Sequence, residues 1–187
     1  MYELQMYGLG GQGAVQGAVV LVDALYRDGK YAQKIPAYTG QRRGGTVSVS
    51  VKIDDKPIRS TCYIYEPDAV LVLGSGLPVG EVSSGLKEDG AAILNEAYGP
   101  EGVDLGVKLS KVATVDASGV WVEVAGPTSI PITNTTMLGA FSRATGLVEL
   151  ESLLEAIKVV FPRFADVNIK AAKLGYERVD VKEYRGE

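Results

Sequence analysis

The stretch Gly8-Leu9-Gly10-Gly11-Gln12-Gly13 decides the fold, because it satisfies the pattern G-x-G-x-x-G between a predicted strand and a predicted helix. Leu4 to Tyr7 is predicted to be the strand. Ala14 to Tyr26 is predicted to be the helix, with Gly29 near its C-terminal cap, since apolar side chains recur there at helical spacing. A strand, a glycine loop and a helix in this order are typical of a Rossmann-like α/β domain.

Three further strands are expected before residue 65. Lys30 to Ile35 is predicted to form one strand, which Pro36 ends. Residues 46–53 alternate between apolar and polar side chains, a pattern that predicts a half-buried strand. Residues 54–57 have the composition of a turn, and Arg59 to Ile64 is predicted to return as the partner strand of a β-hairpin.

The remainder of the chain is predicted to contain buried strands and then helices. Short apolar runs favour strands covered on both faces of a parallel sheet at Ala69 to Leu73, Ala91 to Leu94 and Lys111 to Val115. Helices are predicted at Asn134 to Ala144, at Leu150 to Phe161 and at Val167 to Leu174, the last followed by Gly175 as its cap. Residues 1–187 are therefore expected to form a single α/β domain: a Rossmann-like, mostly parallel sheet with flanking helices and a β-hairpin insertion.

Composition excludes several kinds of site. The chain of 187 residues carries a net charge of −4, with no histidine and a single cysteine, Cys62. Imidazole catalysis and histidine metal sites are therefore excluded, and one thiol cannot hold an iron–sulfur cluster. The charge balance predicts no nucleic-acid partner, and no apolar run approaches the ~20 residues that span a bilayer. Because no basic leader follows Met1, a cytoplasmic location is expected.

The glycine loop is a candidate anion site. Gly8 permits a tight turn, Gly10 lets backbone N–H groups approach an anion, and Gly13 allows the helix to pack closely on the strand. The loop N–H groups and the positive end of the helix favour a phosphate or a carboxylate. A dinucleotide would also require an acidic residue near the end of the second strand, and Lys30 to Pro36 contains none. Glycines that serve packing alone, or a partner's cofactor lying against the loop, are the alternatives.

Two other segments have unusual composition. Arg42 and Arg43, followed by Gly44, place planar donors on a tight turn that suits a phosphate or carboxylate, and solvated charges on an exposed turn explain them equally well. The segment Asn134 to Ala140 begins a predicted helix. For this segment, an N-cap at Thr133 or Asn134 with close packing at Gly139-Ala140 is favoured over a ligand role.

Six motifs follow one another in a fixed order over most of the chain. They are Gly8 to Ala14 (G-x-G-G-Q-G-A), Asp28 to Gln33, Tyr38 to Gly44, Ile53 to Arg59, Tyr65 to Asp68 and Asn134 to Ala140. This set resembles the gamma subunit of the 2-oxoacid:acceptor oxidoreductases, the thiamine-diphosphate enzymes that include pyruvate:ferredoxin oxidoreductase. The chain departs from that family at three positions. Tyr7 and Leu9 stand where the family often has a histidine and an arginine, and Gln41 stands where it usually has a glutamate.

The resemblance implies a division of labour. In this family thiamine diphosphate and magnesium are bound by alpha and beta subunits, and 4Fe–4S clusters by a ferredoxin-like delta subunit. The complex converts a 2-oxoacid and coenzyme A to an acyl-coenzyme A and passes electrons to ferredoxin or another acceptor. This chain is thus expected to hold no cofactor, no metal and no catalytic residue of its own, and to be inactive alone. Pyruvate, branched-chain 2-oxoacids such as ketoisovalerate, 2-oxoglutarate and aryl 2-oxoacids such as phenylglyoxylate all stay open as substrates.

The main hypothesis is a subunit that shapes the coenzyme A side and the subunit interface of such a complex. The residues expected to face coenzyme A or its phosphates are Gly8, Gly10, Gly11, Gln12, Gly13, Arg42, Arg43 and Gly44. The alternatives are a purely structural assembly subunit, in which the loop only packs, and a free-standing NAD-binding Rossmann protein.

Overall fold

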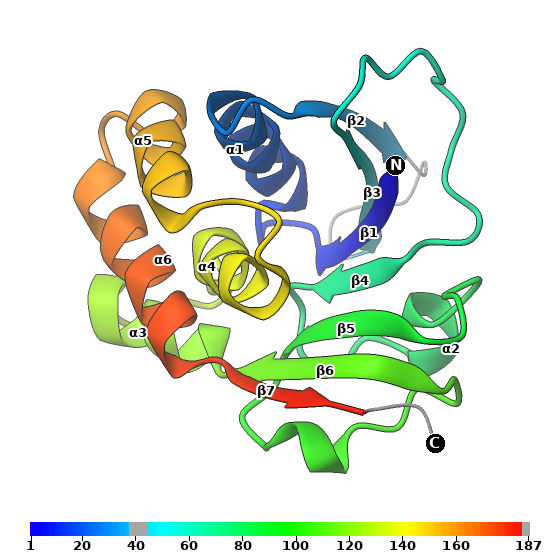
Figure 1. Cartoon of the computed structure of the whole chain (residues 1–187). Coiled ribbons are helices and arrows are strands. Elements are labelled where there is room, and N and C mark those ends of the chain that lie inside the picture. Colours follow the sequence, from blue (N-terminus) through cyan, green and yellow to red (C-terminus); the bar gives the residue numbers. More distant parts are fainter. Residues whose placement is uncertain (38–44, 185–187) are drawn as a thin grey trace.

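The computed structural model describes residues 1–37 and 45–184 and shows one sheet with most of the helices on a single face (Figure 1). The strands are β1 (Tyr2–Leu9), β2 (Tyr31–Ala37), β3 (Thr46–Asp54), β4 (Ala69–Val72), β5 (Gly90–Asn95), β6 (Leu109–Val115) and β7 (Asp180–Glu183). The helices are α1 (Ala14–Arg27), α2 (Val79–Val82), α3 (Ala117–Ala125), α4 (Asn134–Thr145), α5 (Leu150–Val160) and α6 (Ala165–Arg178), with a 3-10 turn η1 (Pro100–Gly102). Within these residues no helix is long and apolar enough to cross a membrane.

The sheet has a parallel centre and antiparallel margins. Its strand order is β2-β3-β1-β4-β5-β6-β7, and β1, β4, β5 and β6 pair in parallel. The strands β3 and β7 run antiparallel to their neighbours β1 and β6. The mostly parallel α/β sheet is therefore confirmed. From β1 the chain passes through α1 to β2 and β3 on one side of β1, and it then reaches β4 on the other side. A topological switch point therefore lies at the carboxyl ends of β1 and β4.

Residues 46–54 form one strand of a β-hairpin, as predicted, but the strand predicted to pair with them was wrong. Residues 46–54 pair with β2, and Arg59 to Ile64 forms no strand. Both edges of β3 are already occupied, by β1 and β2, so the later segment cannot pair with this strand and contacts its Lys52 side chain instead. There the Lys52 ammonium donates to Ser60 Oγ at 3.1 Å and to Cys62 Sγ at 3.4 Å. On the polar side of β3, Ser50 and Lys52 are therefore buried where solvent contact was predicted, whereas Thr46 and Ser48 stay partly exposed.

Two local predictions also differ from the structure. Pro36 does not end β2, which continues to Ala37; β2 is the outermost strand of the sheet, and an edge strand tolerates the missing N–H of proline. Gly175 is not a helix cap, because α6 continues to Arg178. A Cβ on Gly175 would overlap the Thr136 carbonyl group of α4, so this glycine allows the two helices to approach closely.

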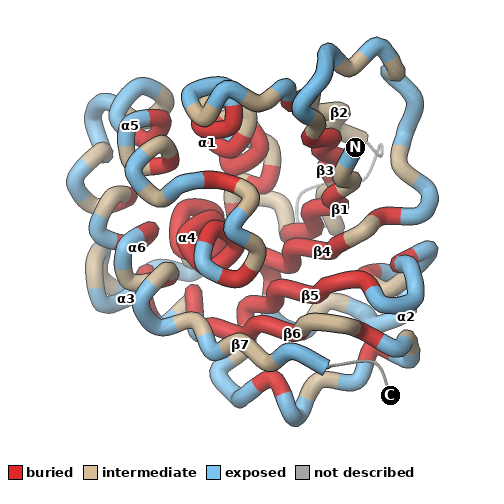
Figure 2. Tube along the Cα trace, in the orientation of Figure 1, coloured by how far each residue is buried: buried red, intermediate tan, exposed pale blue. Residues whose placement is uncertain are grey.

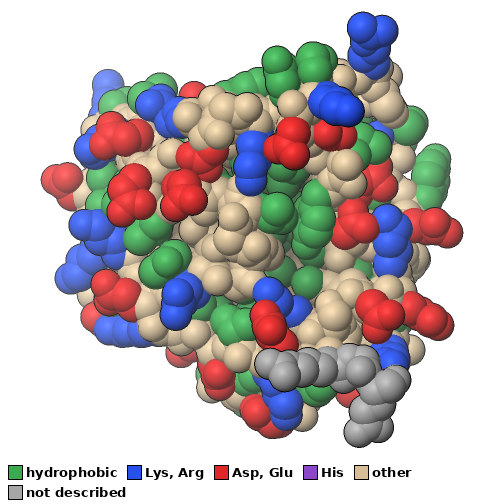
Figure 3. Space-filling model, viewed as in Figure 1, with side chains coloured by type: hydrophobic (Ala, Val, Ile, Leu, Met, Phe, Trp, Pro, Cys, Tyr) green, Lys and Arg blue, Asp and Glu red, His purple; other side chains and the backbone are tan. Residues whose placement is uncertain are grey.

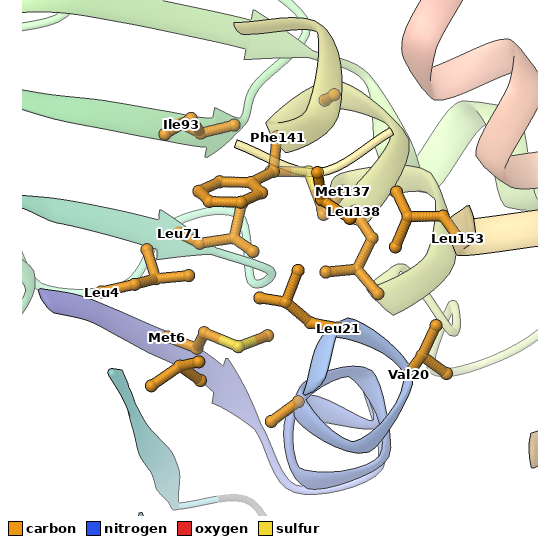
Figure 4. Close-up of a cluster of buried hydrophobic side chains, with 14 of the residues drawn as sticks. Leu4, Met6, Val20, Leu21, Leu71, Ile93, Met137, Leu138, Phe141 and Leu153 are labelled. Carbon is orange, nitrogen blue, oxygen red and sulfur yellow. The ribbon is translucent and has the colours of Figure 1, made fainter. Parts of the chain in front are cut away.

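The main core lies between the sheet and the helical face, as the buried colours of Figure 2 show. Helices α1 and α4 lie next to the sheet, α5 packs on α1, and α6 packs on α4 (Figure 1). Figure 4 shows the interdigitated side chains, which include Leu4, Met6, Leu21, Leu71, Ile93, Met137, Leu138 and Phe141. Each of these is fully buried, and burying one such side chain contributes roughly 1.5–3 kcal/mol.

A smaller apolar cluster covers the opposite face of the parallel strands. Val70 and Val72 of β4 pack there with Val82 of α2 and with Leu86. All four residues of β4 are buried, which confirms that this apolar run is covered on both faces. The helical cover is thus unequal: the short α2 lies on the face opposite the five longer helices (Figure 1).

Candidate functional site

The glycine loop leaves β1 at the switch point and enters α1 directly. Two hydrogen bonds close it on itself: Gln12 N–H donates to the Leu9 carbonyl at 3.1 Å, and Leu9 N–H donates to Gln12 Oε1 at 2.7 Å. A third links it to the start of β3, where Gly10 N–H donates to the Gly45 carbonyl at 3.3 Å. The loop is therefore a fixed turn held against β3.

The Gln12 side chain points into the protein. It is 5% exposed, and its Oε1 would lie 2.8 Å from a Cβ on Gly74 and 3.5 Å from one on Gly8. Glycines at the ends of β1 and β4 thus leave the space that this amide fills. Because Oε1 already accepts a hydrogen bond from Leu9, Gln12 acts first as an internal brace of the loop.

The amino end of α1 has no side-chain cap among the described residues and no acidic side chain in its first turn. Gly13 is the N-cap residue, with φ 82° and ψ 30°, a left-handed conformation that a residue with a Cβ rarely adopts. The N–H groups of that first turn lack helical partners, so with the helix dipole they favour a negative ligand.

A polar network fixes the neighbouring strand ends. Asn95, at the end of β5, donates from Nδ2 to the Leu73 carbonyl at 2.7 Å, and its Oδ1 accepts from Ala117 N–H at 2.9 Å. Thr133 Oγ1 donates to the same Leu73 carbonyl at 2.9 Å. These bonds tie the ends of β4 and β5 to the start of α3 and α4. The sequence analysis missed Asn95, although an asparagine that ends a buried apolar run is a signal for such a role.

Asn134 connects α4 to the glycine loop. Thr133 occupies the N-cap position of α4, but its hydroxyl bonds to Leu73 and not to the helix. The Asn134 amide is 1% exposed, and its Nδ2 donates to the Gly13 carbonyl at 3.1 Å. Capping alone therefore does not explain this asparagine.

The electrostatics beside the loop are acidic on one side. Thr46, which pairs with Leu9, donates from its hydroxyl to Glu81 at 3.1 Å. Burial raises the pKa of Tyr7 above its usual value, and the charge of Glu81 adds to that shift, so Tyr7 stays neutral. An anion at the loop would feel repulsion from Glu81, and a cation nearby would be needed to offset it.

The structure gathers part of the predicted site. Gly8, Gly10, Gly11, Gln12 and Gly13 lie together at the switch point, as expected from the motif. Arg42, Arg43 and Gly44 lie outside the described residues. On the face seen in Figure 3, acidic and basic side chains are interspersed, and side chains of one charge sign do not dominate it. Among the described residues, no group of three or more His, Cys, Asp or Glu side chains could hold a metal ion.

Comparison with protein families matches residues 3–178 to pyruvate ferredoxin/flavodoxin oxidoreductase. The chain belongs to this family. Among relatives, it is 43% identical to pyruvate synthase subunit PorC of Methanothermobacter thermautotrophicus, over 96% of this chain and 97% of the relative. It is 45% identical to the pyruvate/ketoisovalerate oxidoreductases common subunit gamma of Thermococcus kodakarensis, over 98% of this chain and 100% of that one.

A solved structure of the family has the same fold. It is pyruvate oxidoreductase subunit PORC of Thermotoga maritima, with a TM-score of 0.83 and 31% identity over 97% of this chain and 98% of that chain. The likeness covers the antiparallel margins of the sheet as well as the parallel centre. The family resemblance predicted from six sequence motifs is therefore confirmed.

Proposed function

We propose that this chain is the gamma subunit of a thiamine-diphosphate-dependent 2-oxoacid:ferredoxin oxidoreductase and that its glycine loop faces coenzyme A. The complex would oxidatively decarboxylate a 2-oxoacid to an acyl-coenzyme A. The observation that carries the proposal is the amino end of α1 at the switch point, where no described side chain caps the helix and Gln12 braces the loop. Coenzyme A has the phosphates that such a helix end favours.

The catalytic cofactors would be held by partners. With one cysteine and no histidine, this chain lacks the ligands for iron–sulfur clusters, which fits clusters in a ferredoxin-like delta subunit. Thiamine diphosphate and magnesium would lie in alpha and beta subunits. The names of the relatives, subunit PorC and common subunit gamma, support a chain that works within an assembly.

Apolar side chains beside the loop support a subunit interface there. Ile130 is 47% exposed, and its Cγ2 would lie 3.3 Å from a Cβ on Gly11. Two residues further on, Ile132 lines an apolar pocket of about 580 Å³ together with Phe161 and the exposed Phe164. Large apolar side chains left in water next to a candidate site are typical of protein–protein contacts.

A purely structural subunit is the second candidate. The inward direction of Gln12 and the contact between Asn134 and Gly13 favour it, because both show loop glycines serving packing. The two candidates differ in whether any ligand reaches the loop. They also differ in what Arg42 and Arg43 do, since only a ligand-facing loop needs cations to offset Glu81.

Removing these two arginines from the purified complex tests the proposal. The double substitution Arg42→Ala/Arg43→Ala should raise the KM for coenzyme A at least roughly 10- to 100-fold, because the loss of even one charge-assisted hydrogen bond costs about 1.5–3 kcal/mol. The control is Arg27→Ala, since Arg27 is exposed on α1 and forms an ion pair with Asp23 one turn away. If complex assembly and the KM for coenzyme A are both unchanged in the double variant, the proposed role is wrong.

A further inference from the structure

The Asn134 side chain joins α4 to the glycine loop by a hydrogen bond to Gly13. The Gly13 carbonyl accepts two bonds, one from Asn134 Nδ2 at 3.1 Å and one from Gly17 N–H at 2.8 Å. The other amide atom, Oδ1, accepts from Thr135 N–H at 2.7 Å, so the side chain is held at both ends. A buried side chain fixed in this way has one orientation available to it.

Two glycines of the loop and of α1 make room for this amide. A Cβ on Gly13 would lie 2.5 Å from Asn134 Nδ2, and a Cβ on Gly17 would lie 3.2 Å from Asn134 Cβ. The third glycine of the motif therefore meets α4, in addition to allowing helix and strand to pack. Conversely, the position of Asn134 determines where the left-handed turn at Gly13 can lie.

The helix that carries Asn134 is itself fixed. A Cβ on Gly139 would overlap the carbonyl group of Ala172 in α6, and one on Gly175 would overlap that of Thr136 in α4. Backbone contact at two points leaves α4 little freedom to slide along α6, because packed backbones cannot yield as side chains do. Thr135 also donates from Oγ1 to Asn168 Oδ1 at 3.0 Å, but this side-chain bond is separate from the two backbone contacts that fix the helix.

We propose that Asn134 is a positioning residue: it holds the Gly13 turn in place from the fixed helix α4 and so sets the affinity of the complex for coenzyme A. This inference rests on the proposed function for the identity of the ligand. It gives one explanation for the segment Asn134 to Ala140, in which Asn134 bonds to the loop and Gly139 allows α4 to pack closely on α6.

The test compares Asn134→Asp with Thr135→Val. Aspartate keeps the size of asparagine but removes the Nδ2 donor and sets a carboxylate oxygen against the Gly13 carbonyl. In the intact complex it should raise the KM for coenzyme A about 10-fold with kcat changed less than about 2-fold, because the loss is one buried hydrogen bond in the binding site. Thr135→Val removes the bond to Asn168 on the same helical turn and should leave both constants unchanged.

Hydrogen exchange of the full chain separates the inference from the function it rests on. The amides of Leu9, Gln12 and Gly17 are bonded within the loop and the first turn of α1, and Asn134→Asp should speed their exchange. Asn134→Ala is the second variant if aspartate prevents folding, and the same result is expected. Unchanged exchange, or an equal rise in KM for Thr135→Val, overturns the inference. Faster exchange with an unchanged KM leaves the positioning contact standing and overturns the coenzyme A role.

Discussion

Glycine serves two different purposes in the two halves of this molecule. Between α4 and α6, Gly139 and Gly175 bring two backbones together, and the result is a buried helix–helix contact. In the loop after β1, Gly11 and Gly13 take positive φ angles, and the result is a turn that leaves the start of α1 without a side-chain cap from the described residues. The residue type is the same, but one use fixes the scaffold and the other presents backbone to a ligand.

Asn134 lies where these two uses meet. It belongs to the helix that the packing glycines hold, and it bonds to the loop that the positive-φ glycines form. The packed helix α4 therefore supports the loop turn through Asn134, and the shape of the turn does not depend on its four glycines alone. Substitutions should separate the two regions by the size and the kind of their effects.

The largest effect is expected at the helix contact. Gly175→Ala places a Cβ into the Thr136 carbonyl group, and since backbone must shift, the free energy of unfolding should fall by about 3 kcal/mol. Gly80→Ala is the matched control, because nothing lies within 4 Å of that Cβ, and it should change stability by less than about 0.5 kcal/mol. Urea denaturation measures both. Equal stability of the two variants would show that α4 and α6 have room to separate.

A smaller effect is expected at the loop. Gly13→Ala combines a left-handed backbone with a Cβ 2.5 Å from Asn134, and stability should fall by about 2 kcal/mol. Gly29→Ala has a similar φ of 76° but nothing within 4 Å, so about 1 kcal/mol is expected from the backbone alone. The difference between the two unfolding free energies measures the contact with Asn134. If both lose the same amount, that contact contributes nothing.

A weaker clash is expected at the end of β4. A Cβ on Gly74 would approach Gln12 Oε1 at 2.8 Å, the far end of a side chain, so Gly74→Ala should cost about 1 kcal/mol. In a Gln12→Ala background the same change should cost close to nothing, because the obstructing atom is absent. A double-mutant cycle by urea denaturation gives this coupling. Additive costs would mean that Gln12 does not brace the loop between β1 and β4.

No effect is expected from a nicotinamide cofactor. Strand β3 lies between β1 and β2, so the end of β2 is about 10 Å from the glycine loop at the usual strand spacing, and it carries no acidic residue. Titration of the isolated chain with NADH should give no fluorescence enhancement. A saturable increase in NADH fluorescence would indicate a dinucleotide site and would weaken the coenzyme A proposal.

Local pattern predicted the centre of this fold, and long-range pairing decided the rest. The strand, glycine loop and helix of residues 2–27 and the buried run at β4 follow from spacing and apolar content. The strand that pairs with β3 does not follow from local pattern, because β1 and β2 occupy both edges of β3 and leave none for residues 59–64. Gly175 shows the same limit, since only the position of α4 distinguishes a packing glycine from a cap.

The candidate site was predicted in part for the same reason. The motif located Gly8 to Gly13, but the direction of the Gln12 side chain depends on Gly74, which lies far along the chain. Asn95 and Asn134 serve the site through carbonyl groups of Leu73 and Gly13. Backbone acceptors of this kind leave no mark in a sequence, so a polar side chain at the end of a buried segment was the only available signal.

Coenzyme A protection of the loop tests the central claim most directly. Hydrogen exchange of the peptide covering residues 8–17 would be measured in the intact complex with and without coenzyme A. A ligand on the N–H groups at the amino end of α1 should slow exchange there, while peptides of α5, on the outer layer of the helical face, should not change. Identical exchange of residues 8–17 in a complex that still turns over coenzyme A would contradict the account and leave the loop a purely structural element.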